Sequence, residues 1–219
     1  MSFLETTNFR ESIAAYRRKC QHIAKEKLVF VDGTGMKAGA RPGYGLAPKG
    51  KKAKIKTEKP SAYHPRVDMW GAISYNKPLA FDIKTSKDRK QEGVKGYRKK
   101  HLKLFLKKKV APKIANLSCN VILNMDRGFK CSSEELAEAL KAGGAKNVED
   151  VWIFPPNAGK LCNPLDNTLW HSMKQRVRKE KPNSEEELAK AAKKTFMKIS
   201  PKDIHSYVHL LMELIPTKM

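Results

Sequence analysis

The sequence predicts one α/β domain in which helices flank a central mixed sheet of five strands. Three observations favour this fold class. Short runs rich in β-branched and aromatic residues, which are typical of strands, occur at 28–32, 66–84, 118–126 and 151–156. Amphipathic segments with helix-capping signals alternate with the later strands. The 219 residues can bury a substantial core, and the sequence shows no internal repeat or long linker.

In the first half of the chain, residues 1–26 are predicted to form a helix, because apolar residues recur in them near helical spacing. The strand at 28–32 is expected to stop at a turn made by residues 33–35, which are Gly-Thr-Gly. Residues 66–84 are predicted to form two strands joined by a short turn. A helix is expected to follow from about residue 91 to residue 110.

The second half alternates helix and strand more clearly. Ser132 and Glu135 form a capping-box pattern that opens one helix, and Asn163 before Pro164 is predicted to cap another. The helix that begins at Pro164 is expected to bury four apolar residues spaced four apart: Leu165, Leu169, Met173 and Val177. Two further capping signals predict the last helices of the chain, at Ser184 and at Ser200.

The charge of the chain indicates its kind of partner. It carries 45 Lys and Arg against 22 Asp and Glu, a formal net charge of +23, which points to a polyanion and most simply to nucleic acid. No apolar run approaches the roughly 18 residues of a membrane span, so no membrane partner is expected. The cysteines form no CxxC pair and are expected to be free thiols in a reducing compartment: Cys20, Cys119, Cys131 and Cys162.

Three aspartates stand where this layout favours a metal site. Asp32 ends the first predicted strand and Asp126 ends the fourth, so parallel neighbours would bring both carboxylates to one sheet edge. Asp166 lies in the first turn of a later helix, where the helix dipole favours a carboxylate. Three converging carboxylates suit Mg²⁺ or Mn²⁺, and two such ions can support phosphodiester cleavage. The alternative is structural, because an aspartate after a strand is usually a turn residue or a cap.

Three segments resemble the motif blocks of the Tc1/mariner and IS630 transposases. The first-aspartate block of that family, a strand followed by a YGxAPKG-type hairpin, is similar to residues 30–52, FVDGTGMKAGARPGYGLAPKGKK. The second-aspartate strand is similar to residues 121–130, VILNMDRGFK. The third block, with two prolines, NP-x-[DE] and a Trp-containing helix, resembles residues 153–178, IFPPNAGKLCNPLDNTLWHSMKQRVR. The gaps also fit, since 93 residues separate the first two aspartates and 39 separate the last two.

The resemblance implies an RNase H-like catalytic core in which Asp32, Asp126 and Asp166 hold two Mg²⁺ (or Mn²⁺) ions. It implies a transposase that cuts DNA at transposon ends and joins the freed 3′-hydroxyl to target DNA, as a homodimer in the synaptic complex. It would act in the nucleus of a eukaryotic host and otherwise in the cytoplasm. The core is expected to span 27–180, after a helical linker or clamp segment at 1–26 and before helices at 181–219 that pack on it.

The chain also departs from the family pattern. Many members carry Glu directly after the first Asp, where this chain has Gly33, and Asn after the second, where it has Arg127. Members normally carry paired helix-turn-helix domains ahead of the core, and residues 1–26 are too few for them. The chain is therefore expected to be either a trimmed catalytic fragment or a truncated or domesticated descendant. The second hypothesis for its function is a domesticated, catalytically weak or inactive module that holds nucleic acid within a larger assembly. A third is another RNase H-fold nuclease, such as a resolvase.

Other residues are assigned by their type and place. The basic run near residue 50 is predicted to bind DNA phosphates, together with two cations after the second aspartate: Lys49, Lys51, Lys52, Lys54, Lys56, Arg127 and Lys130. His171 is a weak candidate for a contact with the scissile phosphate or a catalytic water. The three tryptophans are predicted to be core residues: Trp70, Trp152 and Trp170.

Overall fold

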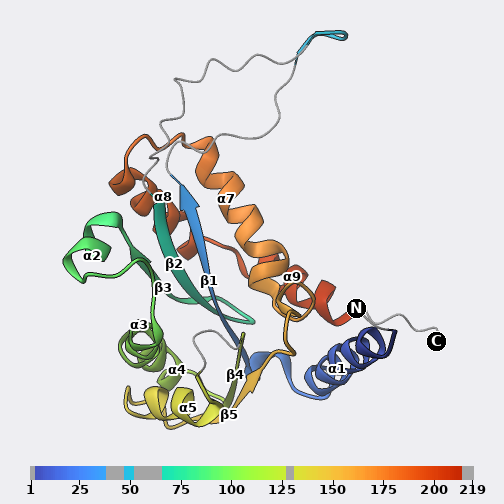
Figure 1. Ribbon diagram of the computed structural model, residues 1–219. Helices are drawn as coiled ribbons and strands as arrows, with labels where there is room; N and C mark the ends of the chain where they lie inside the picture. Colours follow the sequence, from blue (N-terminus) through green and yellow to red (C-terminus); the bar gives the residue numbers. More distant parts are fainter. Residues whose placement is uncertain (1–2, 38–46, 52–65, 127–130, 214–219) are drawn as a thin grey trace.

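A five-stranded mixed sheet forms the centre of the protein, with its strands in the order β3-β2-β1-β4-β5 (Figure 1). The computed structural model describes residues 3–37, 47–51, 66–126 and 131–213. The predicted fold class is confirmed. The strands are β1 (Leu28–Lys37), β2 (Arg66–Ser74), β3 (Pro78–Lys84), β4 (Val121–Met125) and β5 (Val148–Ile153).

The pairing of β1 makes the sheet mixed and determines where Asp32 and Asp126 lie. β1 is antiparallel to β2 and parallel to β4, and β4 is parallel to β5. The parallel pairing of β1 with β4 ends at Val31 and Met125. Asp32 and Asp126 are the next residues of the two strands, so the expected arrangement of two aspartates at one edge follows from the register.

The predicted turn at residues 33–35 is wrong, because β1 continues through them to Lys37 and pairs with β2 as far as Arg66. The two glycines are strand residues over which side chains of β2 lie. A Cβ on Gly33 would lie 2.9 Å from the Trp70 ring, and one on Gly35 would lie 2.6 Å from the guanidinium of Arg66. Gly33 thus permits the close approach of the Trp70 ring, whereas the flexible end of the Arg66 side chain can shift away from Gly35.

Helices cover both faces of the sheet. Figure 1 shows α1 and α7 on one side and α3, α4 and α5 on the other. The helices are α1 (Phe3–Gln21), α2 (Ser86–Gln91), α3 (Lys99–Phe105), α4 (Ala111–Ala115), α5 (Ser133–Lys141), α6 (Gly159–Cys162), α7 (Trp170–Lys179), α8 (Glu185–Met197) and α9 (Pro201–Glu213). Short turns of other helical type are η1 (Lys25–Lys27, 3₁₀), η2 (Leu106–Val110, π) and η4 (Leu165–Leu169, π).

The predicted helix at 91–110 is wrong at both ends. It begins at Lys99, because Gly93 has a φ of +61° and the chain cannot remain helical there. It then continues without a break through η2 and α4 to Ala115 and includes Pro112, which directly follows the π-helical turn η2 and Ala111. The fourth and fifth strands are also shorter or shifted, at 121–125 and 148–153.

The core has one layer on each face of the sheet. The layer under α1, α7, α8 and α9 contains the four predicted apolar residues of the helix that follows Pro164, and all four are buried. The other layer lies under α3, η2, α4 and α5. All three tryptophans are buried, as predicted, and the four cysteines are free thiols. No helix among the described residues is long and apolar enough to cross a membrane.

The helix starts follow the capping signals. Ser132 and Glu135 form the predicted capping box at α5, and the Ser184 hydroxyl accepts a hydrogen bond from the Glu187 N–H at α8. The first helix shares the main core, since its Tyr16 hydroxyl donates to the buried Asn124 Oδ1 at 2.8 Å. The division of the chain at 26/27 and 180/181 stays a prediction.

Candidate active site

The structure brings the three predicted aspartates to one edge of the sheet. Asp32 is half-buried on β1, Asp126 directly follows β4 and is exposed, and Asp166 is exposed on η4. The charges of Asp166 and Asp126 both act on Asp32. Segments far apart in the sequence therefore supply carboxylates to the same place. A π-helical turn such as η4 is frequent at functional sites.

Asp32 is the most strongly perturbed of the three acids. Its pKa is raised to about 7, chiefly by burial and to a smaller extent by the nearby negative charges of Asp166 and Asp126. Hydrogen bonds from the Trp170 indole and the Gly33 N–H partly oppose this shift. The indole Nε1 donates to Asp32 Oδ2 at 2.8 Å. The carboxylate is thus held in one orientation, in surroundings that disfavour its charge when no cation is present.

Space for the Trp170 ring at Asp32 comes from a glycine on the neighbouring strand. Gly71 of β2 lies directly opposite Asp32 in the register. A Cβ on Gly71 would lie 2.6 Å from the Phe196 ring and 2.8 Å from the Trp170 ring. The missing side chain therefore lets α7 and α8 press their aromatic rings onto the sheet beside Asp32.

Asp166 is positioned by the turn that precedes η4. The Asn163 side chain accepts a hydrogen bond from the Leu165 N–H at 3.0 Å, which is the predicted cap. The Arg17 guanidinium of α1 donates to the Leu161 carbonyl at 2.7 Å and so ties α6 to the core. A Cβ on Gly159 would lie 3.0 Å from Asp166 Oδ2. The first residue of α6 therefore leaves room for the third carboxylate.

Replacing Gly159 with alanine is expected to displace the Asp166 carboxylate by a few tenths of an ångström. Because alanine favours a helix more than glycine does, the unfolding temperature should not fall. The metal-dependent DNA cleavage that the resemblance implies should decrease roughly tenfold, since misplacement of a reacting group by about 1 Å costs about 100-fold.

Gly96→Ala is the matched control for this variant, because its Cβ would lie at an ordinary 3.6 Å from Asp68, outside the three carboxylates. Cleavage by Gly159→Ala at the wild-type rate would contradict the assigned role of Asp166.

Sequence reasoning missed a lysine beside the acids. Lys174 of α7 donates to Thr34 Oγ1 at 2.6 Å. Burial lowers the pKa of Lys174, and Arg178 lowers it further, whereas Asp166 and Asp32 raise it. Lys174 therefore lies within electrostatic reach of both carboxylates. The signal in the sequence was the spacing of four residues from Asp166 through Trp170 to Lys174. A spacing of four residues was applied only to the apolar series that begins at Leu165.

The three carboxylates lie near one another, but they do not form a complete metal-binding group. Over the described ranges, no three His, Cys, Asp or Glu side chains lie close enough together to hold a metal ion. Their chemistry nevertheless fits a hard divalent cation, since carboxylate oxygens are the ligands that Mg²⁺ and Mn²⁺ prefer. The raised pKa of Asp32 supports this fit, because a cation would offset both the burial of its charge and the smaller repulsion from the other two acids.

Most of the predicted DNA-binding cations lie outside the described residues: Lys52, Lys54, Lys56, Arg127 and Lys130. Lys49 and Lys51 are exposed in the short described segment 47–51. His171 is exposed on α7, next to Trp170. Their contacts with DNA stay predictions.

A cavity of about 370 Å³ opens on the other face of β1 and β2. Gly33 and Gly35 line it, together with Arg66, Trp70 and Lys95. Asp32 is on the opposite face, where its carboxylate meets Trp170 of α7. At Gly33 the Trp70 ring occupies the space into which a longer side chain would extend.

Comparison with known proteins decides the family. Residues 27–189 match the model of the DDE superfamily endonucleases. The chain belongs to this family. The predicted resemblance to DDE transposases is thus confirmed, and the matched range contains all three aspartates. No curated protein sequence matches the chain.

Solved structures confirm the RNase H-like fold. The catalytic domain of Mos1 mariner transposase superposes with a TM-score of 0.58 at 13% identity, covering 97% of this chain and 91% of that one. The Mos1 paired-end complex with Mg gives a TM-score of 0.71 at 12% identity, over 97% of this chain and 60% of that one. The Mos1 strand transfer complex gives 0.65 at 13% identity, over 94% and 57%. The chain spans about 60% of the longer transposase chains that it matches.

Proposed function

We propose that this DDE endonuclease-family chain is the catalytic domain of a DNA transposase, which cuts phosphodiesters at transposon ends and transfers the freed strand to target DNA. The observation that carries the proposal is the set of three carboxylates at one sheet edge, with Asp32 oriented by Trp170 and raised in pKa to about 7. A net charge of +23 supports a DNA substrate.

Asp32, Asp126 and Asp166 are the proposed ligands of two Mg²⁺ or Mn²⁺ ions. Such ions, when bound, supply a nucleophilic water or hydroxyl and stabilise the departing oxygen. The Trp170 indole holds Oδ2 of Asp32 by a hydrogen bond of 2.8 Å and so orients the carboxylate. Lys174 lies near the same carboxylates and can meet a phosphate oxygen there.

The titles of the solved relatives support the proposed partners. Mos1 has been captured as a paired-end complex with the left transposon end and as a strand transfer complex. Its paired-end complexes contain Mg or Mn. For this chain we therefore propose transposon-end and target DNA as partners, a homodimer in the synaptic complex, and action in the nucleus of a eukaryotic host or otherwise in the cytoplasm.

The proposal is tested by joining DNA and not only by cutting it. The protein is incubated with Mg²⁺, a labelled duplex from the DNA that flanks its gene, and an unlabelled plasmid. The expected product is label covalently joined to the plasmid, absent with EDTA. Nicking of branched DNA without joining would favour a resolvase-type nuclease. Salt-sensitive binding without any turnover would favour the domesticated binding module, and either result would overturn the transposase proposal.

A further inference from the structure

Four side chains spaced four residues apart run along the side of η4 and α7 that faces β1: Asp166, Trp170, Lys174 and Arg178. Alternate residues of β1 lie opposite successive members of this series. Trp170 donates to Asp32, and one turn further along the helix Lys174 donates to Thr34. The helix rises about 6 Å in four residues and the strand about 6.6 Å in two, so the two elements stay in register.

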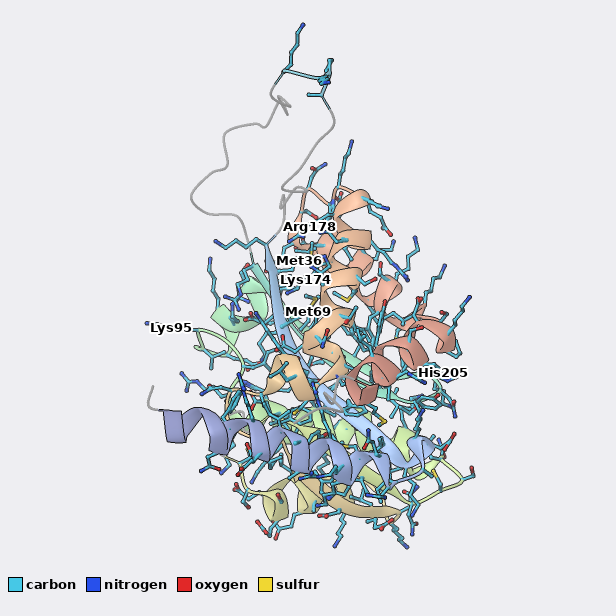
Figure 2. The ribbon with its side chains drawn as sticks, turned by 90° about the vertical axis from the view of Figure 1, so that its right-hand side faces the viewer. Met36, Met69, Lys95, Lys174, Arg178 and His205 are labelled. Carbon is cyan, nitrogen blue, oxygen red and sulfur yellow. The ribbon has the colours of Figure 1, made fainter. Side chains whose placement is uncertain are left out.

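Arg178 occupies the next level of this series. Figure 2 shows Lys174 and Arg178 one above the other on α7, with Arg178 beyond Met36 of β1. Arg178 is half-buried, and among the described residues its Nε atom is buried without a hydrogen-bond partner. The residue as a whole is only half-buried, so the exposed part of its side chain can meet an acceptor oxygen of a ligand.

The end of the helix does not explain this placement. Cations are favoured in the last turn of any helix, and Arg176, Arg178 and Lys179 are all there. Arg176 behaves in that ordinary way: it is exposed and pairs with Asp203 of α9 at 3.0 Å. Lys174 precedes the last turn and is drawn onto β1 beside the acids. Lys174 and Arg178, on the side of α7 that faces β1, thus continue the series of side chains that begins at Asp166.

We propose that Lys174 and Arg178 bind two successive phosphates of the DNA strand that is cut at Asp32, Asp126 and Asp166. They would thereby fix the direction in which that strand leaves the active site, along α7 toward the far end of β1. The step of about 6 Å between the two cations can be spanned by one nucleotide of an extended strand. The proposal rests on the proposed function for its substrate, but its test does not need catalysis.

The test measures DNA binding without metal. Affinity for a fluorescent 20-base-pair duplex is measured by anisotropy in EDTA at several salt concentrations, for the wild type and for Lys174→Gln, Arg178→Gln and the double variant. Each phosphate contact contributes about 0.9 to the slope of log K against log salt concentration. Each single change should therefore reduce the slope by about 0.9, and the double change by about 1.8.

Two controls separate the proposed phosphate contacts of Lys174 and Arg178 from an effect of overall charge and from misfolding. Arg176→Gln removes a cation from the same helix turn but from the outer side, and should leave the slope within about 0.3. Lys174→Arg keeps a positive charge at position 174 and should keep the wild-type slope. It thus provides a charge-preserving comparison at this position if Lys174→Gln proves unstable. Equal slope changes for Arg176→Gln and Arg178→Gln would overturn the proposal, and so would unchanged slopes for Lys174→Gln and Arg178→Gln.

The outcome is distinguishable from failure of the proposed function. Asp32→Asn should bind the duplex in EDTA with an unreduced slope, because it removes no cation. If the slopes of the Lys174 and Arg178 variants fall as expected but no strand joining is detected, the phosphate contacts are supported and the transposase assignment is contradicted. If joining is detected but these slopes do not change, the transposase assignment is supported and the phosphate contacts are contradicted.

Discussion

Asp32→Asn is expected to abolish metal-dependent DNA cleavage while it stabilises the metal-free protein above pH 7. A ligand that helps to supply several kcal/mol of transition-state stabilisation corresponds to at least about 10³-fold in rate. Asparagine keeps the shape of the side chain, and its oxygen can still accept from the Trp170 indole at the present 2.8 Å position. The loss of activity therefore needs no change of fold.

The gain in stability follows from the raised pKa of Asp32, which is about 7 in the folded protein. In the unfolded chain an aspartate titrates at about 3.9. Below that pH both states are protonated, and between about pH 4 and pH 7 the folded state binds more protons than the unfolded state. Wild-type stability consequently falls as pH rises through this window, and above pH 7 the whole destabilisation is present. The uncharged asparagine avoids it.

Thermal unfolding in EDTA at pH 5 and pH 8 measures this effect. The unfolding temperature of Asp32→Asn should exceed that of the wild type by more at pH 8 than at pH 5. Added Mg²⁺ should then raise the wild-type value and leave the variant unchanged, because ligand binding to the folded state stabilises it. A variant that is less stable than the wild type at pH 8 without metal would contradict the electrostatic account of Asp32.

Gly71→Ala should reduce both stability and cleavage. Its Cβ would lie 2.6 Å from the Phe196 ring and 2.8 Å from the Trp170 ring, so both rings must move away from the sheet. Overpacking of this kind costs about 2 kcal/mol, equivalent to an unfolding temperature lower by about 4–8 °C. Movement of Trp170 also releases the Asp32 carboxylate, so cleavage per folded molecule should fall by tenfold or more, on the order expected for a misplaced reacting group.

Gly143→Ala is the matched control for Gly71→Ala. A Cβ on Gly143 would clash with the Lys107 carbonyl oxygen and lie 2.5 Å from the Ala111 Cβ, in the layer on the other face of the sheet. It should lower the unfolding temperature at least as much as Gly71→Ala but leave cleavage per folded molecule unchanged. Equal activity losses for the two variants would mean that Gly71 acts only through stability.

Much of the fold could be predicted from the sequence because its signals are local. The capping box at Ser132 and the Asn163 cap each depend on residues within a few positions, and both are present. The place of Asp32 and Asp126 followed from two strand ends and the general rule for parallel strands. Asp166 was named from its place in the first turn of a predicted helix, and the motif blocks strengthened that assignment.

What the sequence did not predict depends on contacts between distant segments. Gly33 and Gly35 have the composition of a turn, but they are strand residues because their backbone pairs with β2. Trp170 was correctly predicted to be buried, yet its bond to Asp32 exists only because α7 lies along β1. Lys174 was missed for the same reason, since its partner is 140 residues away in the chain.

The most direct test of the account is Mg²⁺-dependent nicking of a supercoiled plasmid by the wild type and by three single variants, Asp32→Asn, Asp126→Asn and Asp166→Asn. All four proteins are first shown to unfold cooperatively. The account predicts nicking by the wild type that EDTA stops, and a loss of at least about 10³-fold in each variant. Nicking at the wild-type rate by any one of the three variants would contradict the claim that these carboxylates together form the active site.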